Sequence, residues 1–270
     1  MAADEGETPY RLHRRFDRIG RLVGDAAMAR LFGAHVMVVG LGGVGSFAVE
    51  ALARSGVGRL TLVDFDRVCV TNSNRQLQAL STTVAREKAA VLAERVQQIN
   101  PQARARAVPT FYDARNAEAL LADRPDFLVD AIDNIKAKCH LIATCRQRGL
   151  PLVVSTGASG RLDPTAIRVA DLGETRVDPL ADACRRILRQ KYGFPSGGSF
   201  GVPAVFSTEA PRPPLPLTYD GGAGFRCVCP GGDNDLHSCE DRSVIWGTAG
   251  FVTGAFGLAC ASVVVRALSG

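Results

Sequence analysis

The chain has 270 residues, of which 46% are hydrophobic and 22% charged, and its formal net charge is +5. This length and balance predict a soluble globular protein of one large domain or two small ones, and they exclude a chain that is disordered throughout. Eight cysteines without a secretory leader indicate reduced thiols in the cytoplasm instead of a disulfide framework.

Residues 1–8 are polar and acidic, and we expect a disordered tail there. From there to residue 156, apolar runs alternate with helical patterns. Strands are predicted at 35–39, 59–63, 105–108, 127–132 and 152–155, and helices at 44–55, 84–99 and 135–148. This alternation predicts a doubly wound, Rossmann-like α/β fold with a mostly parallel sheet. We expect one domain over 9–270, in which 9–156 bind nucleotide and 157–270 bind substrate and a second subunit.

The second half is less regular. Residues 179–192 predict a basic helix that carries Arg185, Arg186, Arg189 and Lys191. Glycine, proline and cysteine dominate 194–241, which predicts a long crossover loop. Residues 244–265 carry no charge and are long enough to span a bilayer, but glycines and hydroxyl residues interrupt them. This pattern favours a tightly packed core or dimer helix at the C-terminus, without membrane insertion.

A glycine-rich turn follows the first predicted strand and precedes a helix. Its G-x-G-x-x-G pattern is formed by Gly40, Gly42 and Gly45, with Gly43 inside it. Glycines permit a tight turn and let the backbone approach phosphate at a helix N-terminus. Asp64 ends the second strand, where an acidic residue would hold a ribose hydroxyl. A nicotinamide dehydrogenase fits these features as well as an ATP-using enzyme does.

Cationic residues after the second strand favour ATP. Arg75 lies in the following loop, and Lys88 shares the apolar stripe of the next predicted helix with Val84 and Leu92. Cleavage of ATP between its α and β phosphates requires cations that stabilise departing pyrophosphate. Asp133 follows the strand at 127–132, and its carboxylate could hold Mg²⁺. Taken singly, the three could be a surface arginine, a lysine stem over the core and a helix cap.

The order of glycines, D-x-D, N-x-x-R, lysine and D-x-x-D-N over about residues 14–156 resembles the E1-like superfamily, which includes the sulfur-carrier adenylyltransferases. The resemblance implies an E1-type adenylation fold in which Gly40–Gly45 hold phosphate, and Asp64, Asp66 and Asn72 form the nucleotide site. It further implies that Arg75 and Lys88 bind ATP phosphates and Asp133 binds Mg²⁺. Arg18 matches an arginine that such enzymes insert from a partner subunit, which implies a homodimer.

Within that superfamily the phrases R15-F16-D17-R18, V68-C69-V70-T71-N72-S73-N74-R75-Q76 and V205-F206-S207-T208-E209 resemble the tRNA threonylcarbamoyladenosine dehydratases. The resemblance implies that the carboxylate of N6-threonylcarbamoyladenosine, at position 37 of tRNA, is adenylated and then closes a ring. The basic residues of 179–192 and of the N-terminus would contact the tRNA backbone.

Two alternatives stay open. The same nucleotide site would adenylate the C-terminus of a small ubiquitin-like sulfur carrier, although the C-x-x-C pairs of that branch are absent. A sulfur-transfer protein is a further candidate partner. Zinc is a second open question, because residue type would allow a tetrahedral site. Reduced loop thiols are the default for its four candidate ligands, Cys227, Cys229, His237 and Cys239.

Overall fold

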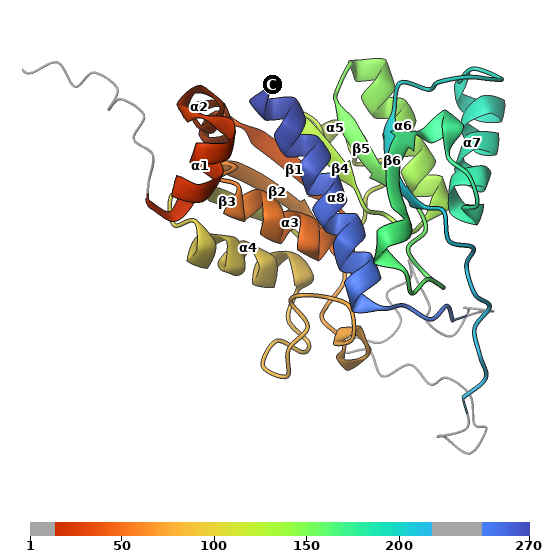
Figure 1. The fold of residues 1–270 in the computed structure, drawn as a ribbon, viewed down its shortest axis with the longest axis horizontal. Helices are drawn as coiled ribbons and strands as arrows, with labels where there is room; N and C mark the ends of the chain where they lie inside the picture. Colours follow the sequence, from red (N-terminus) through yellow and green to blue (C-terminus); the bar gives the residue numbers. More distant parts are fainter. Residues whose placement is uncertain (1–13, 218–244) are drawn as a thin grey trace, which may run out of the picture.

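The computed structural model describes residues 14–217 and 245–270. Its centre is a seven-stranded sheet in the order β3-β2-β1-β4-β5-β7-β6 (Figure 1). Neighbouring strands are parallel except β6, which runs antiparallel to β7 at one edge. The predicted doubly wound α/β fold is therefore confirmed. The strands are β1 (His35–Val39), β2 (Arg59–Val63), β3 (Arg104–Val108), β4 (Phe127–Asp130), β5 (Leu152–Ser155), β6 (Ile167–Asp171) and β7 (Pro203–Ser207).

Helices cover both faces of the sheet. Val36 and Val38 of β1 belong to one core cluster, and Met37 and Val39 belong to the other, because successive side chains of a strand point to opposite faces. The first cluster packs under α1 (Asp17–Val23), α2 (Asp25–Gly33), α3 (Gly45–Arg54), α4 (Lys88–Ile99) and α8 (Gly250–Ser269). The second packs under α5 (Ala117–Leu120), α6 (Ile135–Arg148) and α7 (Pro179–Tyr192).

Strand β1 is central and all five of its residues are buried, since strands flank it on both sides and helices lie above and below. The chain leaves β1 for α3 on one face and leaves β4 for α6 on the other. The loops that follow β1 and β4 therefore diverge at the carboxyl edge of the sheet. This divergence is the topological switch point at which open α/β sheets bind ligands.

Two predicted boundaries were wrong. The helix predicted at 84–99 begins only at Lys88, because Ala85 has a left-handed φ of +72° and Glu87 is extended. Residue Val84 is accordingly exposed instead of sharing the buried stripe. The strand predicted at 127–132 ends at Asp130, which places Asp133 in the loop beyond it.

The segment predicted as a loop from 194 contains a strand. Residues Pro203–Ser207 form β7, which pairs in parallel with β5 and antiparallel with β6. Buried Ala204 and Val205 fill opposite faces of the sheet there. The flanking glycines and prolines concealed this strand from the sequence pattern, because the apolar run between them is only a few residues long.

The C-terminal helix α8 lies across the sheet beside α3 (Figure 1). A side chain at Gly257 would meet the carbonyl of Val44 and the Ala48 nitrogen, so glycine permits close helix packing. The helix is long and apolar enough to cross a membrane, but a single such helix is weak evidence, and 44% of its most apolar window is buried. The inner face of α8 packs in the core, as the sequence predicted for a core helix.

Candidate nucleotide site

The glycine turn after β1 leaves no room for a side chain at Gly40, Gly43 or Gly45. Gly40 has a φ of +89°, and a Cβ there would lie 2.6 Å from the Ala131 carbonyl oxygen. A Cβ at Gly45 would overlap the Gly40 carbonyl, and one at Gly43 would lie 2.9 Å from Oγ1 of Thr253. The α3 helix begins at Gly45, so its amide groups and dipole face the turn. The turn can therefore accept a phosphate against bare backbone.

Asp64 braces this turn from the end of β2. Its carboxylate accepts hydrogen bonds from the Leu41 nitrogen at 2.6 Å and from the Asp66 nitrogen at 2.8 Å. Burial raises the pKa of Asp64, while nearby Lys88 and the two backbone donors oppose that rise. The side chain that the sequence assigned to ribose thus fixes the loop that would surround the nucleotide.

Lys88 is the buried cation of the site. Its side chain is 6% exposed, and its Nζ donates to Asp66 Oδ2 at 2.8 Å. Burial lowers the pKa of Lys88, but the charges of Asp64, Asp66 and Asp133 and the Asp66 hydrogen bond raise it overall. The ammonium is therefore charged at neutral pH. The prediction that Lys88 points inward is confirmed, although it starts the helix instead of lying in its interior.

Arg75 lies in the loop that passes the glycine turn. Its backbone oxygen is 3.2 Å from the Cβ position of Gly43, and its guanidinium donates to the Thr71 carbonyl and to Asn74 Oδ1, both at 2.9 Å. Asn72 is buried, and its side chain accepts from the Cys69 nitrogen at 3.0 Å within the short helix Val70–Asn72. Asn72 therefore shapes the loop that presents Arg75.

Asp133 is exposed in the loop between β4 and α6, and its charge acts on Lys88. The helix cap of α6 is the neighbouring Asn134, whose side chain accepts from the Ala137 nitrogen at 3.0 Å. Across residues 14–217 and 245–270, the Asp133 carboxylate forms no salt bridge. This carboxylate is thus accessible to a ligand and close enough for its charge to act on the buried lysine.

Sequence reasoning missed the ion pair behind this loop. Lys138 Nζ lies 2.8 Å from Asp130 Oδ1, and the two side chains are 1% and 0% exposed. Burial raises the pKa of Asp130, and Lys138 opposes that rise. The same Oδ1 accepts from the Ile132 nitrogen at 3.0 Å, which fixes the first turn of the loop. The signal was present, since a carboxylate inside an apolar strand and a lysine on the next helix require partners.

A second buried pair was also missed. Arg161 Nη2 lies 3.1 Å from Asp178 Oδ2, with side chains 1% and 0% exposed. Asp178 also accepts from Thr156 Oγ1 at 2.9 Å and caps α7 through the Ala181 nitrogen at 2.8 Å. This pair ties the loop after β5 to α7. The loop after β5 therefore has a fixed shape next to the carboxyl edge of the sheet.

Arg18 lies away from this site. It is exposed on α1, two residues after Phe16, which packs near Gly56. Gly56 lies just before β2 begins, whereas the glycine turn follows the end of β1, and the two strands are parallel. Arg18 is therefore at the opposite end of the strands from the glycine turn of its own chain.

The four basic residues of α7 differ in surroundings. Arg185 is half-buried against Thr175, where its Nη1 donates to the carbonyl oxygen at 2.9 Å. Arg189 donates to the Pro195 carbonyl at 3.1 Å and stacks 5.3 Å from the ring centre of Phe200. Arg186 and Lys191 are exposed. Arg185 thus tethers the segment before α7 and Arg189 the segment after it, while the other two face solvent.

The four potential zinc ligands at 227–239 lie outside the described residues, so zinc binding stays a prediction. Within 14–217 and 245–270, no group of three or more potential metal-binding histidine, cysteine, aspartate or glutamate residues occurs. The glycine turn at the switch point, together with a charged lysine among carboxylates, defines a nucleotide-binding α/β protein built to receive phosphate groups.

Comparison with known proteins sharpens this class. The model of the ThiF family matches residues 16–270, and the chain belongs to that family. It is 42% identical over 255 residues to the tRNA threonylcarbamoyladenosine dehydratase of Escherichia coli. The aligned residues cover 94% of this chain and 92% of the relative. The enzyme of the same name from Haemophilus influenzae is 46% identical over 198 residues, covering 73% and 76% of the two chains.

A solved structure of the Escherichia coli dehydratase in complex with ATP superimposes with a TM-score of 0.80 at 40% identity, covering 94% of this chain and 93% of that one. A molybdopterin-synthase adenylyltransferase from Escherichia coli is 36% identical over 130 residues, covering 48% of this chain and 51% of the relative. The similarity to the dehydratase extends over the second half of the chain, whereas the similarity to the adenylyltransferase covers about half of it.

Proposed function

We propose that this protein is an ATP-dependent tRNA threonylcarbamoyladenosine dehydratase. The observation that carries the proposal is Lys88, charged and buried among carboxylates beside a glycine turn, in a chain that is similar to that enzyme over nearly its full length. The alternative of activating a sulfur carrier has weaker support, because similarity to those adenylyltransferases is limited to about half of the chain.

The reaction begins with attack of a carboxylate oxygen of N6-threonylcarbamoyladenosine on the α-phosphorus of ATP. The bond between the α-phosphorus and the bridging oxygen breaks, and pyrophosphate leaves. Lys88 and Arg75 stabilise the negative charge on the departing group, and the amides at the start of α3 hold phosphate. An internal nitrogen or oxygen of the same substrate then attacks the activated carbonyl, AMP leaves, a proton is lost, and the net change is loss of water.

This design needs no nucleophile from the protein. Because the attacking atom is already on the substrate, its effective concentration is high once the carboxylate is activated. The described cysteines are buried in agreement with such a site, and burial raises the pKa of the Cys260 thiol to about 12. Residues of the loop after β5, fixed by the Arg161–Asp178 pair, would border the substrate at this edge.

Mg²⁺ that accompanies ATP fits Asp133 at this edge, because the Asp133 carboxylate is exposed and forms no salt bridge within the described residues. Asp133 would hold the ion, which when bound neutralises charge on the ATP phosphates. Asp64, Asp66 and Asn72 shape the nucleotide pocket through the loops that they brace.

We further propose a cytoplasmic homodimer. Arg18 lies at the opposite end of the strands from its own glycine turn, so it would reach ATP only in a second subunit. Among the basic residues of α7, Arg186 and Lys191 are the exposed candidates for contact with tRNA, whereas Arg185 and Arg189 are bonded to the segments before and after the helix.

The test uses purified protein, ATP and tRNA that carries the modified nucleoside. We expect release of AMP and pyrophosphate, together with loss of one water from the nucleoside by mass spectrometry. AMP release that requires a sulfur-carrier protein and leaves the tRNA unchanged would replace the proposal with the adenylyltransferase alternative. Unmodified tRNA is the control, because it lacks the carboxylate that must be activated.

A further inference from the structure

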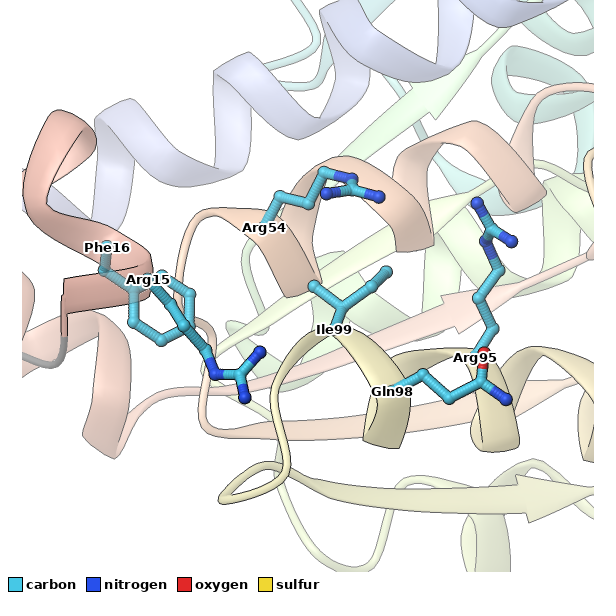
Figure 2. A pocket seen from close by; sticks show the side chains of 6 residues that line it. All are labelled: Arg15, Phe16, Arg54, Arg95, Gln98 and Ile99. Carbon is cyan, nitrogen blue, oxygen red and sulfur yellow. The ribbon is translucent and has the colours of Figure 1, made fainter.

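A cationic pocket lies at the end of the molecule away from the nucleotide site. Its volume is about 440 Å³, and three different elements contribute its walls. Figure 2 shows three arginines arranged around Ile99 and Gln98, each arising from its own element. The lining residues are Arg15 and Phe16 of the short helix Arg14–Phe16, Arg54 of α3, and Arg95, Gln98 and Ile99 of α4.

Glu50 orients two of these arginines. Arg95 binds it in bidentate fashion, with Nε 2.6 Å from Oε2 and Nη2 3.1 Å from Oε1, and Arg54 Nε donates to Oε1 at 2.7 Å. The Glu50 side chain is only 13% exposed. Burial raises the pKa of Glu50, but the hydrogen bonds from Arg95 and Arg54 outweigh burial and lower this pKa overall. A carboxylate that stays ionised thus holds both guanidinium groups in fixed positions.

Glu50 does not balance the charge of the two arginines that it orients. The single carboxylate serves both Arg54 and Arg95, which leaves one net positive charge among these three side chains, and Arg15 lies on the pocket wall as well. Guanidinium groups match the oxygens of a phosphate in geometry, and fixed ones lose little entropy on binding. Ile99 and Phe16 supply an apolar wall, and the Gln98 amide can both donate and accept a hydrogen bond. These features fit a phosphate that belongs to a larger ligand.

The pocket is linked to the nucleotide site by two helices. Helix α3 begins at Gly45 in the glycine turn, and Arg54 lies nine residues along it, about 14 Å at 1.5 Å per residue. Helix α4 begins at Lys88, and Arg95 lies seven residues along it, about 10 Å. A stacked nucleic-acid strand advances about 3.4 Å per nucleotide, so either distance corresponds to about three or four nucleotides.

We propose that this arginine pocket binds a phosphate of the tRNA backbone, a few nucleotides away from the base that is modified. The inference rests on the proposed function, since it takes tRNA as the substrate. It places an RNA contact on the face of α3 and α4, in addition to the exposed basic residues of α7.

The experiment measures tRNA affinity by fluorescence anisotropy as a function of salt, for the wild type and for Arg54→Gln. This substitution keeps the bidentate Arg95–Glu50 pair, so the fold is retained. We expect tRNA binding to weaken by about fivefold to tenfold and the slope of log affinity against log salt to decrease by about 0.7 to 1. Affinity for ATP should not change. In Arg15→Gln/Arg54→Gln, the slope should fall by about twice as much.

Arg106→Gln is the matched control, because Arg106 is also an exposed arginine with a carboxylate partner, Asp123, but lies on the opposite face of the sheet. Equal loss of affinity in the control and in Arg54→Gln would reject a specific pocket in favour of general charge. A changed oligomeric state in Arg54→Gln with unchanged tRNA affinity would assign the pocket to a second copy of the chain and overturn the proposal.

Inorganic phosphate separates the possible sources of the ligand. Competition by millimolar phosphate against tRNA, lost in Arg54→Gln, supports the site, whereas a second ATP-binding event that disappears in Arg54→Gln would assign the pocket to free nucleotide. Failure of the wild type to convert modified tRNA would reject the proposed function itself. Normal conversion by the wild type, with unaltered tRNA binding and KM for tRNA in Arg54→Gln, would reject only the pocket.

Discussion

Two buried lysines stand at the carboxyl edge of the same sheet and have different environments. Lys88 pairs with Asp66, whose side chain is 41% exposed, and lies near two further carboxylates. Lys138 pairs with Asp130, and both side chains are almost completely enclosed. The first pair is open on one side to a ligand, while the second is closed within the core. Buried charges therefore have two uses in this protein. Lys88 can bind a ligand at the carboxyl edge of the sheet, and the Lys138–Asp130 pair fixes the loop that follows β4.

The largest expected effect is on stability and tests the closed pair. Lys138→Met leaves the Asp130 carboxylate without its partner inside the core, and we expect a loss of about 3–5 kcal/mol in the free energy of unfolding. Urea unfolding followed by circular dichroism measures the change. The double variant Asp130→Leu/Lys138→Met should recover most of the lost stability, because it removes both charges. No recovery would mean that the pair stabilises the fold beyond neutralising its two charges, for example through the Asp130 hydrogen bond to the Ile132 nitrogen.

The open pair should respond in activity. Lys88→Met removes the cation that stabilises departing pyrophosphate, and we expect AMP release with modified tRNA to fall by about 100-fold to 1,000-fold. Stability should fall less than in Lys138→Met, since water can reach Asp66. Steady-state kinetics and urea unfolding of the same preparation check both statements. If Lys88→Met lost as much stability as Lys138→Met but kept its turnover, Lys88 would have the structural use assigned here to Lys138.

Asp133 tests whether the open side of the Lys88 cluster holds a metal. In Asp133→Asn the ligand charge is lost while the shape is kept, so we expect a decrease of about tenfold to 100-fold in AMP release, with little change in stability. Raising the Mg²⁺ concentration should restore part of the activity. Activity that is equally low at every Mg²⁺ concentration would separate Asp133 from metal binding. Asn134→Ala, which removes the helix cap of α6, is the structural comparison.

The smallest effect is the pH dependence of the Lys88 cluster. Its carboxylates raise the pKa of Lys88 above the ordinary value of about 10.4, so folding favours the protonated lysine. The resulting stability is fully present below that ordinary pKa and is lost as pH rises through the higher folded-state pKa. The difference in unfolding free energy between the wild type and Lys88→Met should therefore be constant near neutral pH and decline in strongly alkaline solution. A constant difference over the whole range would contradict the raised pKa.

Local patterns predicted most of the fold. Apolar runs such as His35–Val39, alternating with amphipathic helices, are sufficient to indicate a parallel sheet covered on both faces, and the glycine spacing located the turn. The helix predicted at 84–99 had the wrong start, since Ala85 has a left-handed φ and its nitrogen donates to the Val68 carbonyl instead of to a helical partner. Strand β7 was missed because its pairing partners, β5 and β6, lie far from it in the sequence.

The candidate site was only partly predictable. Residue order indicated Lys88, Asp64 and Asp133, and family resemblance assigned their roles, while the geometry of the site came from the packing of β1, β2 and β4.

The sequence by itself determined the alternation of strands and helices, the glycine turn and the inward-facing lysine, because these depend on residues that are neighbours along the chain. Only the tertiary structure decided that Asp130 and Lys138 form a closed pair, that Glu50 orients arginines from two helices, and that Arg18 lies far from its own glycine turn. The physical reason is that electrostatic and packing energies depend on distances across the fold, which the linear order of residues does not specify.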